Sequence, residues 1–388
     1  MKKKKVCIIT ATRAEYGILK PLILKLKSLP ELETSLVVTG SHLTESQGYT
    51  CREIERDGIE ISARIPINAE GNTSYDITRT QACALLEFGR YFQEEKPDLL
   101  VVLGDRTEIL AFCTAAMNEQ IPIAHIHGGE LTQGAVDDNI RHAVTKMSYL
   151  HFASTEEYRR RIIQMGEEPE RVFNVGALGV ENILQEKLLS RPELAEQAGF
   201  PAEKDYAVVT FHPVTLEPGE AETQVRELFQ AMESRPNLFY LITKANADAG
   251  GEAINAYMER ETSGHSNMKL VASLGMKRYL SAVKYARFVL GNSSSGIIEV
   301  PALGVPTVNI GDRQKGRIMA DSIINCGSDC QSIQRAMTQA LEMKTGTYRN
   351  PYGDGTTSEQ IARIIKSFLE KEPINLKKTF YDISWKDI

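Results

Sequence analysis

The sequence lacks any apolar run of about 18 residues, the length that a membrane-spanning helix needs. Basic residues 2–5 resemble the start of a secretory signal, but the apolar stretch that follows, residues 6–9, is only as long as a strand. The 6 cysteines show no metal-ligand spacing, and the closest pair, Cys326 and Cys330, has no second pair beside it. These absences predict a soluble, cytoplasmic protein with free thiols.

Positive charge and the common nucleotide-binding fingerprints are also missing. The formal net charge is −6, and no basic face is evident that would bind DNA or RNA. Neither GxxxxGK[ST] nor a GxGxxG after a strand occurs, so we expect no nicotinamide and no other cofactor. Any phosphate must be bound by a few placed cations and by backbone N–H groups.

What the sequence does contain is a regular alternation of short apolar strands and longer helical patterns. Continuous apolar strands such as Leu99–Leu103 need cover on both faces, which is typical of a parallel sheet. In the first half, strands are predicted at residues 6–10, 35–40, 99–104, 122–128, 150–154 and 172–176. In the second half, they are predicted at residues 206–211, 238–244, 269–273, 288–291 and 307–310.

The length of 388 residues suits two domains of this kind. We predict the α/β class, with two doubly wound Rossmann-like domains that face a central cleft. The first domain is expected at residues 1–180 and the second at residues 181–360. Residues 361–388 are expected to form a closing helix and a tail that crosses back to the first domain.

The junctions that follow the predicted strands are the candidate site, because ligands of open parallel sheets bind beyond the carboxyl ends of the strands. Arg13 follows the first strand beside helix N-terminal amides, where it can meet a phosphate or simply lie on the surface. Asp105 and Arg106 follow the strand at 99–104, where they can serve the chemistry or form only a local ion pair.

Acids and histidines follow the next strand. His125 and His127 share one strand face, and a metal site there would need Glu130 or a later acid as third ligand; we favour acid–base work and predict no metal. Asp138 lies four residues before His142 on one helical face, although alone it could be an N-cap. Acids at three consecutive junctions would crowd one pocket and raise one another's pKa values, which suits proton transfer.

The junctions of the second half suit a phosphate instead. His212 follows the strand at 206–211, and Asn246 follows the next strand. Small hydroxyl residues in Gly291-Asn-Ser-Ser-Ser-Gly296 open a helix that contains Glu299, and they can cradle a phosphate or merely cap the helix. Arg313 follows the last predicted strand. A cleft between such halves would hold a nucleotide sugar.

The motifs occur in a specific order and spacing. They include Thr12-Arg-Ala-Glu-Tyr-Gly17, Gly104-Asp-Arg106, His125-Ile-His-Gly-Gly-Glu130, Asn246-Ala-Asp-Ala-Gly250 and Gly291-Asn-Ser-Ser-Ser-Gly296. In that order they resemble the hydrolysing UDP-N-acetylglucosamine 2-epimerases of sialic-acid biosynthesis. The non-hydrolysing relatives typically read Thr-Arg-Pro-Glu and His-Val-Glu-Ala-Gly at these places, so Ala14 and Gly128 make this chain more similar to the hydrolysing branch.

The resemblance implies a GT-B-like fold and a two-step reaction. A base removes the proton at C2 while UDP leaves C1, and water then adds to the 2-acetamidoglucal to give N-acetylmannosamine. It also implies a homodimer or homotetramer.

The resemblance assigns roles to the junction residues. Proton transfer falls to Asp105, Glu130 and Asp138, any of which can be the group that removes the C2 proton, and His212 is also counted as catalytic. The expected diphosphate and ribose contacts are His212, Ser293, Ser294 and Glu299; the charge partners are Arg13, Arg106 and Arg313; and His42 and Asn246 line the same cleft.

Three other functions fit parts of this pattern. The same chemistry could act on UDP-N,N′-diacetylbacillosamine or on a GDP-linked amino sugar of a legionaminic-acid pathway. A GT-B glycosyltransferase would share the domains, but it would leave the three acidic junctions without a task. A nucleotide-sugar sensor would bind the same ligand without turnover.

Overall fold

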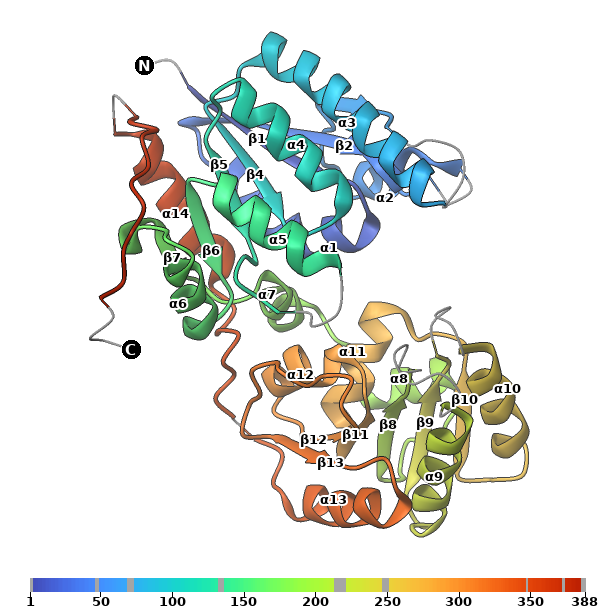
Figure 1. Cartoon of the computed structure of the whole chain (residues 1–388). Coiled ribbons are helices and arrows are strands. Elements are labelled where there is room, and N and C mark those ends of the chain that lie inside the picture. Colours follow the sequence, from blue (N-terminus) through green and yellow to red (C-terminus); the bar gives the residue numbers. More distant parts are fainter. Residues whose placement is uncertain are drawn as a thin grey trace. The chain divides into compact units, whose positions relative to one another are not determined.

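The computed structural model describes residues 3–45, 49–67, 73–131, 136–212, 221–245, 251–346, 348–371 and 374–384. The chain forms two compact units (Figure 1). Unit 1 comprises Met1–Asn182 and Tyr352–Ile388, and unit 2 comprises Ile183–Pro351. Residues 352–360, which the sequence assigns to the second domain, therefore lie in unit 1.

Unit 1 is built on a 7-stranded sheet with the order β3-β2-β1-β4-β5-β6-β7, in which every pair is parallel. Its strands are β1 (Lys4–Thr10), β2 (Leu32–Thr39), β3 (Ala63–Ile65), β4 (Leu99–Leu103), β5 (Ile123–Ile126), β6 (Leu150–Ala153) and β7 (Val172–Asn174). Its helices are α1 (Arg13–Lys27), α2 (Cys51–Arg56), α3 (Ser74–Glu95), α4 (Thr107–Asn118), α5 (Val136–Met147), α6 (Glu156–Gln164) and α14 (Thr357–Leu369). Helix α7 (Leu178–Gln185) leads into unit 2.

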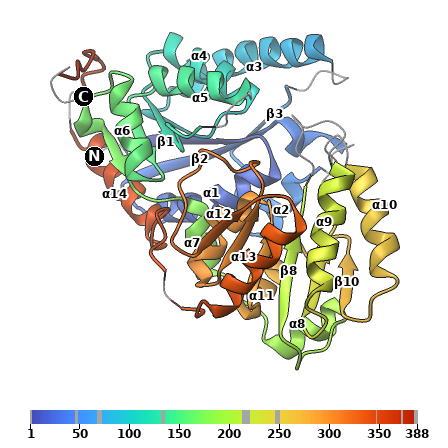
Figure 2. The same ribbon diagram turned by 60° about the horizontal axis from the view of Figure 1, so that its bottom comes forward.

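Helices cover both faces of this sheet, as the continuous apolar strands predict. Figure 2 shows α3, α4 and α5 on one side of the sheet and α1 and α14 on the other. Phe88 and Phe112 pack together under the first group, with ring centroids 4.2 Å apart. Ile361 and Ile365 of α14 belong to the same core as Leu22 of α1, so the closing helix is part of unit 1.

Unit 2 repeats the architecture with a 6-stranded parallel sheet in the order β10-β9-β8-β11-β12-β13. Its strands are β8 (Tyr206–Thr210), β9 (Phe239–Thr243), β10 (Met268–Val271), β11 (Phe288–Gly291), β12 (Thr307–Ile310) and β13 (Ile323–Cys326). Its helices are α8 (Arg191–Ala198), α9 (Ala221–Glu233), α10 (Gly251–Thr262), α11 (Gly275–Tyr285), α12 (Ser294–Ile298) and α13 (Cys330–Glu342). The predicted pair of doubly wound parallel-sheet domains is confirmed.

The strand order fixes where each unit can bind a ligand. In unit 1 the order reverses between β1 and β4, and in unit 2 it reverses between β8 and β11. At such a switch point the connections leave toward opposite faces and open a crevice at the carboxyl ends. Arg13 and Asp105 lie at the first switch point, and His212 and Asn292 lie at the second.

The described C-terminal tail runs along unit 1. The backbone N–H of Tyr381 donates to the carbonyl of Gly166 at 3.0 Å, and the Lys378 ammonium reaches the buried Glu167 carboxylate at 2.6 Å. Among the helices that the structure describes, none is both long enough and apolar enough to span a membrane.

Candidate active site

Arg141 organises the carboxylates of unit 1. Its guanidinium is only 5% exposed, and Nη1 donates to Asp138 Oδ1 at 2.6 Å and to the backbone carbonyl of Glu130 at 2.7 Å. The other nitrogen, Nη2, forms an ion pair with Asp105 Oδ2. The ends of β4 and β5 and the first turns of α5 are therefore tied together by one side chain, which brings together the three acids that the sequence singled out.

The surroundings of the Asp105 carboxylate change its proton affinity. Burial raises the pKa of Asp105, and the nearby charges of Asp137 and Glu130 raise it further. The Arg141 guanidinium opposes the rise but does not cancel it. A carboxylate with a raised pKa is a better base toward a weakly acidic C–H proton. Of the other two acids singled out from the sequence, Glu130 contributes to the rise at Asp105, and burial is its largest cause.

Glu130 is held by a second set of contacts. Ser154 Oγ donates to Glu130 Oε1 at 2.8 Å, and His127 Nδ1 lies 3.5 Å from the same oxygen. His127 has a left-handed backbone (φ 67°), and Gly129 after it has φ 78°. A Cβ at Gly129 would meet the carbonyl oxygen of Tyr158 at 2.5 Å, so this turn requires glycine there. The turn places the Glu130 carboxylate against Ser154 and His127 and its backbone carbonyl against Arg141.

His125 is not a metal ligand in this arrangement. It is fully buried, Nε2 lies 2.8 Å from the carbonyl oxygen of Gly104, and Nδ1 lies 3.2 Å from Thr145 Oγ1. Burial lowers the pKa of His125 to about 3, so the ring is neutral and braces the loop that carries Asp105. Across the described ranges, no group of three or more histidines, cysteines and acids is arranged to hold a metal ion.

The end of β1 carries a separate pair of groups. Glu15 accepts hydrogen bonds from the backbone N–H groups of Ala11 and Thr12 at 2.8 and 2.9 Å, and burial raises its pKa to about 7. The Arg106 charge acts on this carboxylate, while Arg106 itself donates to Glu108 at 2.7 Å.

Arg13 and His42 take different positions around the same strand end. Arg13 is 71% exposed and pairs with Glu53 at 3.0 Å, apart from the carboxylates that Arg141 joins. His42 is fully buried, with Nε2 3.1 Å from Thr10 Oγ1 and Nδ1 2.8 Å from Thr50 Oγ1, and burial lowers its pKa to about 4. In this structure His42 supports the end of β1, since both ring nitrogens are already engaged.

Asn292 plays the organising role in unit 2. Its side-chain carbonyl accepts a hydrogen bond from the backbone N–H of His212 at 2.8 Å. Its side-chain amide donates to the backbone carbonyl of His212, also at 2.8 Å. Arg313 Nη1 and Gln314 Nε2 both donate to the Asn292 backbone carbonyl, at 3.1 and 2.9 Å. Three of the junctions that the sequence proposed for a phosphate, those of His212, Ser293 and Arg313, are thereby joined.

Gly291 makes this junction possible. Its φ is 141°, and a Cβ there would lie 1.9 Å from the carbonyl oxygen of Thr210 on β8. Only glycine allows the two strand ends to approach so closely at the switch point.

The serines after Asn292 open α12. Ser293 is the N-cap and accepts from the Ser295 N–H at 3.4 Å. Ser295 Oγ lies 2.7 Å from Glu299 Oε2, and burial raises the pKa of Glu299. Ser293 and Ser294 are partly exposed at the start of this helix, a kind of position that favours an anion.

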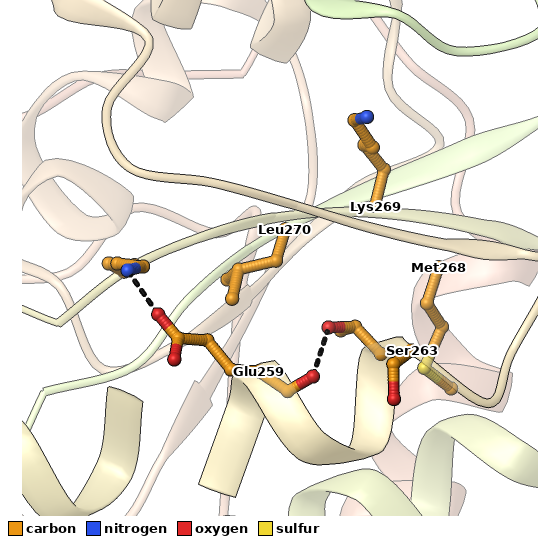
Figure 3. A pocket seen from close by; sticks show the side chains of 7 residues that line it. Glu259, Ser263, Met268, Lys269 and Leu270 are labelled. Carbon is orange, nitrogen blue, oxygen red and sulfur yellow. Dashed lines mark hydrogen bonds and ion pairs between the residues drawn. The ribbon is translucent and has the colours of Figure 1, made fainter. Parts of the chain in front are cut away.

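Asn246, the remaining expected contact, lies outside the described residues, together with the rest of the 246–250 motif. Lys244 follows the preceding strand, β9, and forms an ion pair with Glu259 at the rim of a pocket of about 370 Å³ between α10 and β10 (Figure 3). This pocket lies at the β10 edge of the sheet, and none of the residues that line it was expected in the site.

Two organising residues were missed by sequence reasoning. Arg141 follows Asp138 by three residues on α5, and that spacing is a signal for an ion pair which could have found it. Asn292 acts on His212, 80 residues earlier in the chain, and no local pattern reveals such a contact.

Two parallel-sheet α/β units, each with polar groups at its switch point, define a fold of the GT-B-like class. A family model described as UDP-N-acetylglucosamine 2-epimerase matches residues 24–366. The chain belongs to the UDP-N-acetylglucosamine 2-epimerase family.

Relatives with high coverage include hydrolysing enzymes. The chain is 38% identical over 345 residues to the GDP/UDP-N,N′-diacetylbacillosamine 2-epimerase (hydrolyzing) of Campylobacter jejuni, covering 89% of each chain. It is 39% identical over 385 residues to the polysialic acid biosynthesis protein P7 of Escherichia coli, covering 98% of each. It is 34% identical over 364 residues to the UDP-N,N′-diacetylbacillosamine 2-epimerase (hydrolyzing) of Legionella pneumophila, covering 94% of this chain and 96% of the relative.

Solved structures share the fold. The UDP-GlcNAc 2-epimerase of Neisseria meningitidis bound to UDP-GlcNAc superposes with a TM-score of 0.78 at 18% identity, covering 94% of this chain and 100% of that one. The enzyme of Methanocaldococcus jannaschii gives a TM-score of 0.77 at 21% identity, covering 94% and 99%.

Proposed function

We propose that this enzyme converts UDP-N-acetylglucosamine and water to N-acetylmannosamine and UDP, in the biosynthesis of sialic acid or a related nonulosonic acid. One observation carries the proposal: Arg141 joins Asp105 and Asp138 and binds the backbone of Glu130 at one strand-end cluster. Phosphate binding alone needs no such gathering of acids, whereas proton removal and return at carbon does.

The proposed first step is an elimination. A carboxylate of unit 1 takes the C2 proton, the C1–O bond breaks, the electrons of the C2–H bond form the C1=C2 double bond, and UDP leaves with the C1–O pair. In the second step water supplies the C1 hydroxyl, and a proton returns to C2 on the opposite face, which gives the manno configuration. The three acids, Asp105, Glu130 and Asp138, are the proposed proton-transfer groups.

Unit 2 is proposed to bind the nucleotide. The N-terminal amides of α12 with Ser293 and Ser294 would meet the diphosphate, and Arg313 and the neighbouring His212 would stabilise charge as UDP departs. Glu299 is proposed to bind the ribose. Arg13 and Arg106 are proposed as further charge partners; His42 and Asn246 are proposed to line the same site.

A second sugar is favoured by a specific finding. Two of the relatives are named for UDP-N,N′-diacetylbacillosamine, whereas the Escherichia coli relative is named for polysialic acid biosynthesis. The deciding experiment supplies each UDP-sugar, and a GDP-linked counterpart, to the purified enzyme and compares kcat/KM. The main proposal is supported if N-acetylmannosamine is released and UDP-N-acetylglucosamine has the highest kcat/KM of the substrates. If only a diacetylated sugar is turned over, that sugar takes its place as the proposed substrate.

One observation distinguishes the glycosyltransferase alternative from the proposed epimerase. A transferase needs an acceptor, whereas the proposed elimination releases UDP from the sugar nucleotide alone. Release of UDP and a free sugar without acceptor therefore excludes transfer as the primary activity. We further propose a cytoplasmic homodimer or homotetramer, which light scattering of the purified protein tests.

A further inference from the structure

A chain of hydroxyl groups in unit 2 leads to Glu299. Ser295 Oγ lies 2.7 Å from Glu299 Oε2 and 3.0 Å from the hydroxyl of Tyr279 on α11. Thr210, at the end of β8, is the second hydrogen-bond partner of that phenol, and its own hydroxyl lies 2.9 Å from that of Thr243 at the end of β9. The chain thus links two strands and two helices to one carboxylate.

The number of protons available decides which hydroxyl donates and which accepts in this row of hydrogen bonds. Each hydroxyl has one proton to donate, and an ionised carboxylate can only accept. Ser295 must therefore donate to Glu299, and the Tyr279 phenol must donate to Ser295. Burial raises the pKa of Tyr279, so the phenol keeps its proton at neutral pH and remains a donor. The Thr243 hydroxyl donates to the Val209 carbonyl at 3.4 Å, so this direction toward Glu299 holds for Tyr279 and Ser295.

The same contacts leave one carboxylate oxygen available. Ser295 bonds Oε2 of Glu299. Among the described residues 251–346, none donates a hydrogen bond to Oε1 of Glu299. The helix itself is fixed, because Thr307 Oγ1 donates to the Gly296 carbonyl at 2.9 Å. A Cβ at Gly296 would lie 2.9 Å from Thr307 Cγ2, so α12 packs directly on β12. Glu299 is therefore held in one orientation, with a free acceptor.

We propose that Tyr279 and Ser295 form a positioning pair that orients the Glu299 carboxylate to accept hydrogen bonds from the ribose hydroxyls of the nucleotide. The proposal rests on the proposed function, in which unit 2 binds the nucleotide. A carboxylate accepts well from vicinal hydroxyls only if its plane is fixed, because a rotating group loses conformational entropy on binding. Tyr279 touches no reacting atom, so its effect passes through Ser295.

The test compares two nucleotides that differ only in the ribose hydroxyls. Isothermal titration calorimetry measures the Kd of UDP and of 2′,3′-dideoxy-UDP for the wild type, Tyr279→Phe, Ser295→Ala and Glu299→Gln. We expect the wild type to prefer UDP, and we expect Tyr279→Phe and Ser295→Ala to reduce that preference by roughly five- to thirtyfold while dideoxy-UDP binding changes little. The double variant should lose no more than the weaker-binding single variant, because both act on one carboxylate.

Tyr206→Phe is the matched control. The Tyr206 hydroxyl is also buried in unit 2, but it donates to the Ala282 carbonyl at 2.7 Å, not to the chain that ends at Glu299. Its removal should lower the unfolding temperature and leave the ratio of the two Kd values unchanged. In steady-state assays, Tyr279→Phe should raise KM for the UDP-sugar by a larger factor than it lowers kcat.

The outcomes distinguish the positioning role of Tyr279 and Ser295 from the ribose-binding role of Glu299. If Glu299→Gln abolishes the preference for UDP and Tyr279→Phe keeps it, the positioning pair is wrong and the ribose role of Glu299 stands. Equal weakening of both nucleotides in Tyr279→Phe also overturns the pair. If the wild type shows no preference, the ribose role proposed for Glu299 fails first. Ser295→Ala provides the same reading should Tyr279→Phe fold poorly.

Discussion

The switch points of the two units are organised by different kinds of side chain. In unit 1 the organiser is a buried cation, Arg141, whose partners include two carboxylates. In unit 2 the organiser is a neutral amide, Asn292, whose partners are the backbone N–H and carbonyl of His212. With the same strand topology, the organising side chain is therefore charged at one switch point and neutral at the other.

Under the proposed function, this difference separates proton transfer in unit 1 from nucleotide binding in unit 2. Burial and the nearby charges of Asp137 and Glu130 raise the pKa of Asp105, while the Arg141 guanidinium lowers it. Backbone and hydroxyl dipoles bind an anion without competing for its protons. The comparison predicts that damage to the first site reduces turnover, whereas damage to the second weakens nucleotide binding.

The largest effect is expected for Asp105→Asn and Asp138→Asn. Each removes a group from the proposed proton transfer and should lower kcat by about 10²- to 10⁴-fold. The Kd of UDP should change little, because the nucleotide is assigned to unit 2. Asp137→Asn is the matched control, since this neighbouring acid is exposed; it should cost much less. Full activity in both of the first two variants would refute the assignment.

Arg141→Met tests the organiser of unit 1. Its loss leaves the Asp105 and Asp138 carboxylates partly buried without their counter-charge, which should lower the free energy of unfolding by about 3–5 kcal/mol. Urea titration followed by circular dichroism measures the change, and kcat should fall as well. Arg160→Met, at a residue whose side chain is 77% exposed, should be nearly neutral. Comparable losses in the two variants would contradict the organising role.

Gly291→Ala tests the corresponding junction of unit 2. The new Cβ would lie 1.9 Å from the Thr210 carbonyl oxygen, so β8 and β11 must separate at their ends. The expected loss is about 3 kcal/mol of stability together with weaker UDP binding. Gly264→Ala, where the new Cβ would lie 3.6 Å from the Glu261 carbonyl oxygen, serves as control. Unchanged UDP affinity in Gly291→Ala would contradict the assignment of nucleotide binding to the switch point of unit 2.

Glu167 provides a buried carboxylate of unit 1 outside the strand-end cluster. Burial alone would raise its pKa, but His151, Lys146 and Lys378 together lower it to about 2. Because the folded pKa lies below the ordinary value of 4.5, this carboxylate stabilises the fold above about pH 4.5, and the stabilisation is lost as pH falls toward 2.

Glu167→Gln should therefore lower the free energy of unfolding at pH 7 by roughly 3 kcal/mol. Unfolding curves of the two proteins from pH 7 downward should converge as the acid limit is approached. Turnover per folded molecule should change less than in Asp105→Asn. A difference in stability that stays constant with pH would show that the carboxylate charge is not its cause.

The sequence predicts most strands of both units and misses one edge strand in each. Every predicted strand corresponds to a strand of the structure, but β3 and β13 were not predicted. Both are edge strands of three or four residues, and Ala63–Ile65 carries a charged residue in its middle, so local hydrophobicity gives little signal.

The candidate site divides in the same way. Asp105, Glu130 and Asp138 could be found because each follows a predicted strand or opens a helix, and the carboxyl ends of parallel strands meet at one edge. Asn292 and the Tyr279–Ser295 pair could not, since their contacts depend on how distant segments pack. For His42 the motif suggests a ligand contact, whereas the ring is buried against Thr10 and Thr50, so its place in the site stays a prediction.

The most direct test of the proposed elimination is turnover of UDP-N-acetylglucosamine, and of UDP-N,N′-diacetylbacillosamine beside it, in D₂O, followed by proton NMR. We predict release of UDP and of a free sugar with the manno configuration that carries deuterium at C2, because the C2 proton is lost to the enzyme and returned from solvent. A free sugar that keeps its original hydrogen and configuration at C2, or an epimerised sugar still attached to UDP, would contradict the account.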